Sequence, residues 1–100
     1  MRKIIILGLL FLASCSNQKQ IKQIAEVSCG QCKFDLDTEL GCSLALRFES
    51  KAYFVDGFGI DDFGNAHNEK IGLCNAIRKG EITGVLQNNR FAASSLKLID

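Results

Sequence analysis

The sequence predicts a mainly β fold with one short helix, arranged as a small OB-like five-stranded barrel in the order β-β-β-α-β-β. Two observations lead to this prediction. A chain of 100 residues is at most one domain, and its 47% hydrophobic and 23% charged content is typical of a globular protein. Five short apolar stretches have the composition of strands, and one stretch with helical spacing lies between the third and the fourth.

The first three strands follow one another directly. Residues 21–27 predict a strand whose apolar positions change phase midway, so a bulge or a bend would be needed to bury all of them. Residues 43–49 place Leu44, Leu46 and Phe48 on one face, as in a half-buried strand. After a turn at residues 50–51, residues 52–55 form the third strand, and Asp56-Gly57 ends it with turn residues.

The second half of the chain predicts a helix and two strands. Ile71, Cys74 and Ile77 recur at helical spacing before a stop at Gly80, which predicts one short helix over residues 71–79. Residues 81–86 and 91–99 have the composition of strands. The Asn pair in the connecting residues 87–90 suits a hairpin turn.

The N-terminus has the pattern of an export signal. Two basic residues precede the apolar run 4–12, which is too short to span a bilayer, and Leu12-Ala13-Ser14-Cys15 resembles the bacterial lipobox. We therefore expect residues 1–14 to be a lipoprotein signal peptide and Cys15 to carry the lipid, including palmitate. Residues 15–23 would form a lipidated polar tether and residues 24–100 the domain. The membrane is then a partner through the lipid anchor, in the cell envelope, and Ser16 after the lipidated residue favours the outer membrane.

The charge balance excludes several classes of function. Without residues 1–14 the chain keeps ten basic and eleven acidic residues, a net charge of −1. A nucleic-acid partner is not expected because OB-fold proteins that bind nucleic acid need a basic groove. The chain is also too short for the usual kinase or dehydrogenase domains.

Four cysteines remain in the predicted domain: Cys29, Cys32, Cys42 and Cys74. An even number of thiols in an exported protein, together with a core too small to be secure without covalent help, favours two intramolecular disulfides. Sequence alone does not choose among the three pairings. We prefer Cys32 with Cys42 and Cys29 with Cys74, because a bond from loop to helix constrains the chain most.

A metal site is the alternative to disulfides. The C-x₂-C pair at Cys29 and Cys32 could combine with Cys42, Cys74 or the only histidine, His67, to bind Zn or Cu(I). The first half of this spacing is typical of zinc sites. The second half is not, because the chain has no second C-x₂-C or H-x₃-H, so we expect no bound cofactor.

The sequence gives less support to an enzyme. Cys29-Gly30-Gln31-Cys32 looks like the active site of a thiol oxidoreductase, but no clear helix follows it and the chain has no proline for the cis-Pro of thioredoxin-type sites. The acidic residues 56–69 do not match the calcium template of the EF-hand and suit a capped turn. His67 has no recognisable nucleophile motif near it, so no catalytic residue is assigned.

The chain resembles one family in several short motifs. These are Cys29-Gly30-Gln31-Cys32, Gly41-Cys42, Tyr53-Phe54-Val55-Asp56-Gly57, Ile60-Asp61-Asp62, Gly64-Asn65-Ala66-His67 and Cys74-Asn75-Ala76-Ile77-Arg78-Lys79. Together they are similar to a group of small secreted proteins and lipoproteins, largely from Bacteroidota, classed as a domain of unknown function. The resemblance covers roughly residues 27–98 and implies no known activity.

The resemblance also implies that the four cysteines and His67 belong to one pattern. Phe63 stands where a second histidine is expected in this family, which favours structural cysteines over a metal site in this chain. The sequence thus predicts a membrane-anchored lipoprotein that serves as a non-enzymatic envelope binding or structural module. Metal binding is the alternative and thiol–disulfide redox chemistry the third choice, and no protein or small-molecule partner is identified.

Overall fold

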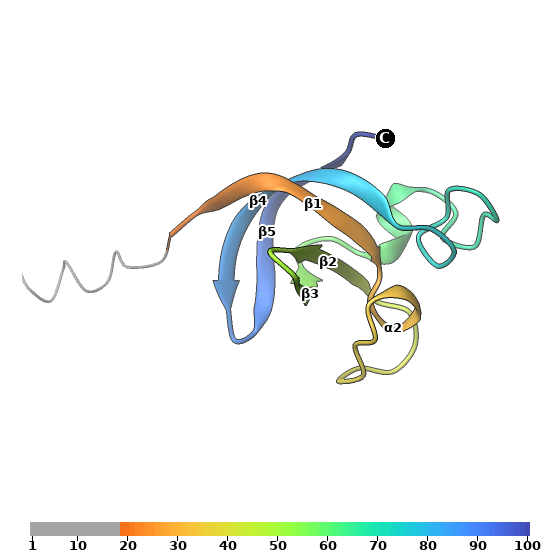
Figure 1. Ribbon diagram of the computed structural model, residues 1–100, viewed down its shortest axis with the longest axis horizontal. Coiled ribbons are helices and arrows are strands. Elements are labelled where there is room, and N and C mark those ends of the chain that lie inside the picture. The colour runs from red at the N-terminus through yellow and green to blue at the C-terminus, as the bar shows by residue number, and fades with distance from the viewer. Residues whose placement is uncertain (1–18) are drawn as a thin grey trace, which may run out of the picture.

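The computed structural model describes residues 19–100, so the predicted signal peptide and Cys15 lie outside the described residues. Five strands form a closed barrel in the order β1-β2-β3-β5-β4 (Figure 1). The elements are β1 (Ile21–Cys29), α2 (Gly30–Lys33), β2 (Leu44–Phe48), β3 (Lys51–Asp56), the 3₁₀ helix η1 (Ile60–Phe63), β4 (Arg78–Gln87) and β5 (Arg90–Leu98). Strands β3 and β5 are parallel and the other neighbours antiparallel. The predicted OB-like barrel is confirmed.

Two tight turns set the register of the hairpins. The β4–β5 turn consists of Asn88 and Asn89, with φ of 55° and 61°, which is the left-handed pair that a two-residue hairpin requires. The predicted Asn hairpin is therefore confirmed. The β2–β3 turn uses Glu49 and Ser50 in the same way, with φ of 52° and 68°, one residue earlier than the sequence predicts.

Strand β1 differs from the prediction in its regularity and in where it begins relative to the tether. It keeps one register with β4 from Ile21 to Val27, and Ile24 points outward with 56% of its surface exposed. Because Ile24 need not be buried, β1 does not require the expected bulge. The irregularity lies instead in the β4–β5 ladder at Thr83/Gly84. Residues 21–23 form the start of the strand, as the strand predicted over residues 21–27 has it, and not the end of the tether predicted over residues 15–23.

The predicted position of the helix is wrong. The connection between β3 and β4 holds η1 and a series of turns, whereas the short α-helix α2 follows β1. Asn68 explains why residues 71–77 are not helical, because its side-chain oxygen accepts hydrogen bonds from the backbone N–H groups of Lys70 and Ile71. Asn75 donates to the carbonyl oxygens of His67 and Asn68. Such local side-chain bonds compete with a helix.

The barrel has one core inside and a smaller one outside. The inner core contains Ala25, Val27, Leu44, Leu46, Phe48, Val55, Leu73, Ile82, Phe91 and Leu96. Leu73, which is 2% exposed, comes from the long β3–β4 connection and fixes this connection to the barrel. The outer cluster of Phe34, Ala45 and Phe54 packs the segment after α2 against the barrel wall.

Candidate cysteine metal centre

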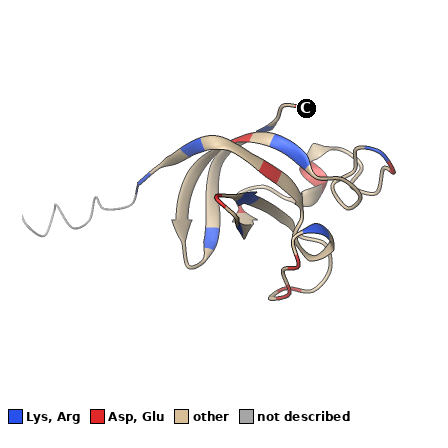
Figure 2. Ribbon diagram, in the orientation of Figure 1, with Lys and Arg blue, Asp and Glu red and all other residues tan. Residues whose placement is uncertain are grey.

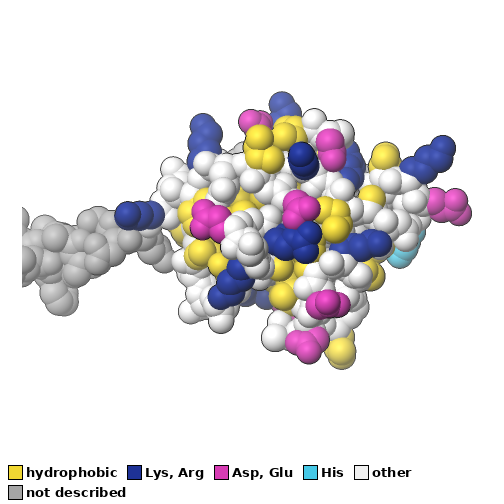
Figure 3. Space-filling view, viewed as in Figure 1, with side chains coloured by type: hydrophobic (Ala, Val, Ile, Leu, Met, Phe, Trp, Pro, Cys, Tyr) yellow, Lys and Arg dark blue, Asp and Glu magenta, His cyan; other side chains and the backbone are white. Residues whose placement is uncertain are grey.

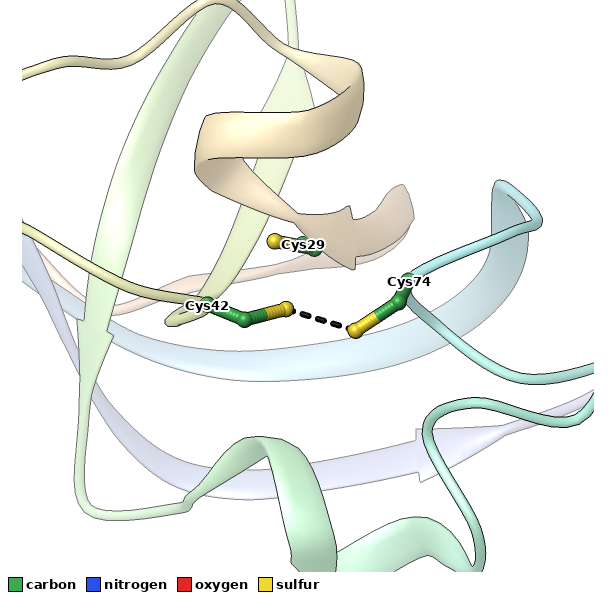
Figure 4. A group of neighbouring side chains, drawn as sticks. All are labelled: Cys29, Cys42 and Cys74. Carbon is green, nitrogen blue, oxygen red and sulfur yellow. Dashed lines mark hydrogen bonds between the residues drawn. The ribbon is translucent and has the colours of Figure 1, made fainter.

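The fold brings three distant segments together at one end of β1. Cys29 is the last residue of β1, Cys42 precedes β2, and Cys74 belongs to the turns before β4. Figure 4 shows their side chains converging from these three segments. Cys32 lies in α2, one turn after Cys29. All four cysteines of the described residues are free thiols.

The sulfur atoms form a compact group. The Sγ atoms of Cys29, Cys42 and Cys74 all lie within 4.8 Å of one another, and those of Cys42 and Cys74 are 2.7 Å apart. Cys29 is buried, Cys42 and Cys74 are half-buried, and Cys32 is exposed. The group is therefore shielded from solvent at Cys29 and partly exposed at Cys42 and Cys74.

Ser28 and Cys29 hold the segment that carries Cys74. The buried Ser28 hydroxyl lies 2.7 Å from the carbonyl oxygens of both Leu73 and Ala76, on either side of Cys74 and Asn75. The backbone N–H of Cys29 donates to the carbonyl of Leu73 at 3.0 Å. Since Leu73 is itself buried in the barrel core, Cys74 has little freedom to move away from Cys29.

Gln31 holds the segment that carries Cys42. Its Oε1 accepts the backbone N–H of Ser43 at 2.8 Å, and its Nε2 donates to the carbonyl of Glu39 and to the Ser43 hydroxyl, both at 3.2 Å. The Cys29 thiol also donates to Oε1 at 3.6 Å. Gly30 adds a backbone hydrogen bond to the Ser43 carbonyl at 2.9 Å.

Only glycine fits at the start of α2. A Cβ on Gly30 would lie 2.7 Å from the ring of Phe54 and 3.0 Å from the Cβ of Ala45. The close approach of this backbone to the barrel wall places Gln31 over the Cys42 segment. The residues between the two cysteines of the C-x₂-C pair therefore have distinct structural roles.

Ion pairs also hold residues 34–43, the segment that leads to Cys42, against the outside of the barrel. Arg90, at the start of β5, pairs with both Glu39 and Asp56, and its guanidinium lies 5.6 Å from the ring centre of Phe54. The guanidinium of Arg47 lies 4.7 Å from the ring centre of Phe34. These contacts are partly exposed, so each contributes little alone, but together they restrain residues 34–43.

The thiols differ in acidity. Burial raises the pKa of Cys29, but hydrogen bonds from the Cys42 and Cys32 thiols and from the backbone N–H groups of Cys32 and Gln31 lower it, and the net shift is downward. The hydrogen bond with Cys29 raises the pKa of Cys32. Burial, followed by hydrogen bonds with Cys29 and Cys74, raises the pKa of Cys42 well above its ordinary value. A negative charge in this group is thus best placed on Cys29.

This arrangement does not suit nucleophilic catalysis. An attacking cysteine needs a thiol that is both acidic and accessible. Here the acidic thiol, Cys29, is buried, and the exposed thiol, Cys32, has a raised pKa. The helix α2 begins inside the C-x₂-C pair, at Gly30, and ends at Lys33, so the pair is not followed by a longer helix. Three sulfur atoms that converge within 4.8 Å suit a bound cation better.

The structure joins some of the predicted site residues and separates others. Cys29, Cys42 and Cys74 come together, whereas Cys32 lies exposed in α2 outside this group. His67 lies exposed in the β3–β4 connection, where its backbone N–H donates to Asn65, and is not a member of the metal-ligand group among residues 19–100. The nearest sulfur pair, Cys42 and Cys74, is not one of the pairs that we preferred for disulfides. In the acidic loop, Asp62 accepts the N–H of Gly59 and caps η1, as expected of a capped turn.

Sequence reasoning missed Ser28 and Gln31. Both are directly adjacent to cysteines, yet neither residue type signals a role by itself, because hydrogen bonds to segments 8 to 48 residues away depend on the fold. A buried serine next to a cysteine at the end of a strand is the only sequence feature that could have indicated the first of them.

The surface gives no sign of a polyanion site. Basic and acidic positions are interspersed along the described chain (Figure 2), and the face seen in Figure 3 carries both signs without a patch of one. A shallow depression lined by Lys22, Glu81 and Lys97 with polar neighbours likewise mixes charges. Within residues 19–100, no helix has the length and apolar character needed to cross a membrane.

Comparison with known proteins identifies the family. No curated protein and no solved structure matches the chain. Residues 23–99, which cover the barrel apart from the first two residues of β1 and include Cys29, Cys32, Cys42 and Cys74, match a family described as a family of unknown function. The motifs and the bacterial group named for the resemblance stay predictions. On this match, the chain belongs to the family of unknown function DUF6370.

Proposed function

We propose that this protein is a membrane-anchored, non-enzymatic envelope module that binds one thiophilic metal ion, Zn²⁺ or Cu⁺, through Cys29, Cys42 and Cys74. The observation that carries the proposal is the convergence of these three sulfur atoms within 4.8 Å from three separate segments. Thiolates are the ligands that favour both ions. Metal binding, the alternative in the sequence prediction, thereby becomes the leading function.

The distances support a single ion. With metal–sulfur bonds of about 2.3 Å, tetrahedral ligands lie about 3.8 Å apart. The observed limit of 4.8 Å among the three sulfur atoms is compatible with this value. The Cys42–Cys74 separation of 2.7 Å must open by about 1 Å. Rotation of two half-buried side chains is enough for such a change.

The surroundings also suit a metal-binding site. Gln31 fixes the segment of Cys42 and Ser28 fixes that of Cys74 by hydrogen bonds that do not consume the sulfur atoms of these cysteines. Ligands supported in this way bind with less loss of conformational entropy. A cation would also compensate the negative charge that the buried Cys29 favours.

Metal binding is tested on the full-length protein purified in detergent under reducing conditions without chelator. Native mass spectrometry and elemental analysis should find one Zn²⁺ or Cu⁺ per chain, and Co²⁺ should give the charge-transfer absorption of cobalt thiolates. Cys42→Ser and Cys74→Ser should abolish binding, whereas Ser94→Ala, an exposed substitution on β5, should leave it unchanged. A reduced parent protein without stoichiometric metal would refute the proposal.

A disulfide between Cys42 and Cys74 is the second candidate for this site. It is favoured by the 2.7 Å separation of their sulfur atoms, which a small movement would convert into a bond of about 2.05 Å. In that case the site would be structural, as the sequence prediction preferred. Intact mass before and after alkylation of protein purified without reductant separates the two functions: a bridge removes two alkylatable thiols, whereas a metal site leaves them free.

The membrane anchor rests on the lipobox pattern Leu12-Ala13-Ser14-Cys15. Lipid on Cys15 holds the domain at the envelope because two or three acyl chains bind a bilayer essentially permanently. Detergent phase partitioning tests this part of the proposal. The parent protein should enter the detergent phase and Cys15→Ala should not, and an intact mass that still includes residues 1–14 would contradict the anchor.

A further inference from the structure

The fourth cysteine differs from the other three in place and in exposure. Cys32 is exposed and is not one of the three residues whose sulfur atoms lie within 4.8 Å of one another. It follows Cys29 by three residues, in the one-turn helix α2, and its interaction with Cys29 raises the pKa of its thiol. Cys32 is therefore the solvent-exposed member of the C-x₂-C pair whose other member, Cys29, belongs to the sulfur group.

We infer that Cys32 is an exchange ligand, through which the bound ion passes to and from an external partner that presents thiol ligands. The inference rests on the proposed function. It specifies that the site transfers its metal and that the partner is a thiol-bearing metal donor or acceptor. A structural site, by contrast, has four closed ligands, and sites that exchange a ligand keep one position open.

The position of Cys32 explains why it can leave without loss of the ion. Cys29 is fixed at the end of β1, Cys42 by Gln31, and Cys74 by Ser28. Cys32 lies in the one-turn helix α2 with its side chain in solvent. Three anchored sulfur atoms hold the ion while the ligand at the fourth position is exchanged.

The exchange step balances in bonds and protons. A thiol of the partner loses its proton as its sulfur bonds to the metal, and the metal–Cys32 bond breaks as the Cys32 sulfur takes up a proton. Repetition of the same step at Cys74, Cys42 and Cys29 completes the transfer. No electrons move, so no oxidant or reductant is needed, and the ion keeps its charge.

Transfer kinetics test the inference. The full-length protein is loaded with Zn²⁺ in one experiment and with Cu⁺ in another, and each sample is mixed with excess dimercaptosuccinate as the thiol acceptor. The metal that remains on the protein is measured over time by native mass spectrometry. The parent is compared with Cys32→Ser, with Cys29→Ser as the variant that removes an anchored ligand. Cys32→Ser changes an exposed side chain and should fold as the parent does.

We expect Cys32→Ser to keep one metal ion per chain, with an affinity within about tenfold of the parent. Its transfer rate should fall by about tenfold or more, and Cys29→Ser should retain no ion. The ion, Zn²⁺ or Cu⁺, that Cys32→Ser retains but transfers more slowly is the ion that the protein transfers. If Cys32→Ser loses the metal as completely as Cys29→Ser, the site is a closed four-ligand site and the inference is wrong. Transfer from Cys32→Ser at the parent rate would also overturn it, and a parent that binds neither ion would instead refute the proposed function itself.

Discussion

Replacement of Gln31 by Ala tests whether this side chain builds the site. The substitution removes three hydrogen bonds to the segment that carries Cys42: from the Ser43 N–H at 2.8 Å, and to the Glu39 carbonyl and the Ser43 hydroxyl at 3.2 Å. At about 1 kcal/mol for each neutral hydrogen bond, the loss is about 3 kcal/mol. The folded state no longer restricts the rotamers of a glutamine side chain, and this gain in entropy offsets about 1 kcal/mol of the loss.

The expected net loss is about 2 kcal/mol in the free energy of unfolding, which lowers the melting temperature of a domain of this size by about 8–16 °C. Metal affinity should fall by about 10- to 100-fold, because Cys42 is no longer positioned. Urea denaturation of the reduced, metal-free protein measures the first effect and competition with a chromophoric chelator the second.

Two further variants sharpen this test. Gln20→Ala removes the same side chain from an exposed position before β1 and should change neither quantity. Gln31→Glu keeps an oxygen acceptor for the Ser43 N–H but loses both donated hydrogen bonds, so its loss of stability should be intermediate. If Gln31→Ala melted within about 2 °C of the parent and bound metal equally well, the Arg90 ion pairs alone would suffice to hold the segment, and the reasoning would be refuted.

Three other predictions concern the barrel and the thiols. Gly84→Ala should destabilise the barrel by about 1–3 kcal/mol in chemical denaturation, because the added Cβ would lie 2.7 Å from the Phe91 ring. Gly59→Ala is the control and should be nearly neutral, because its Cβ would meet only a carboxylate oxygen at 3.7 Å. The raised pKa values of Cys32 and Cys42 keep both thiols protonated near pH 7, so metal binding should release protons into weak buffer and tighten as the pH rises; binding independent of pH would contradict this. Oxidation of Cys42 and Cys74 by a disulfide such as oxidised glutathione should abolish metal binding, and dithiothreitol should restore it; metal retained in the oxidised protein would exclude this pair as ligands.

The barrel could be predicted because its determinants are local. Alternating side chains in residues 44–48 and the Asn88-Asn89 turn specify strands and a hairpin by themselves. The helix position could not be predicted from periodicity alone. Ile71 and Ile77, which belong to the helical spacing, stay 58% and 41% exposed, whereas Leu73, which lies outside that spacing, enters the core.

The candidate site was only half predictable for a similar reason. The sequence identifies the four cysteines, but their pairing depends on which loops meet at the end of β1. Ser28 bonds to a segment 45 residues away and Gln31 to one 12 residues away. Neither contact leaves a local pattern. The distance between His67 and the sulfur group likewise follows from turns that Asn68 and Asn75 form, rather than from the spacing of the residues.

Strand β1 connects the part of the barrel nearest the proposed lipid anchor to the sulfur group. The chain enters the barrel at Ile21, on the side of the tether, and reaches the sulfur group at Cys29 after nine residues of extended backbone. At about 3.3 Å for each of the eight steps from Ile21 to Cys29, this distance is about 26 Å, close to the thickness of the hydrocarbon core of a bilayer. In the lipid-anchored protein that we propose, β1 thus acts as a spacer that can hold the thiols well above the headgroups. Water-soluble partners would then reach the site more readily than proteins embedded in the same membrane.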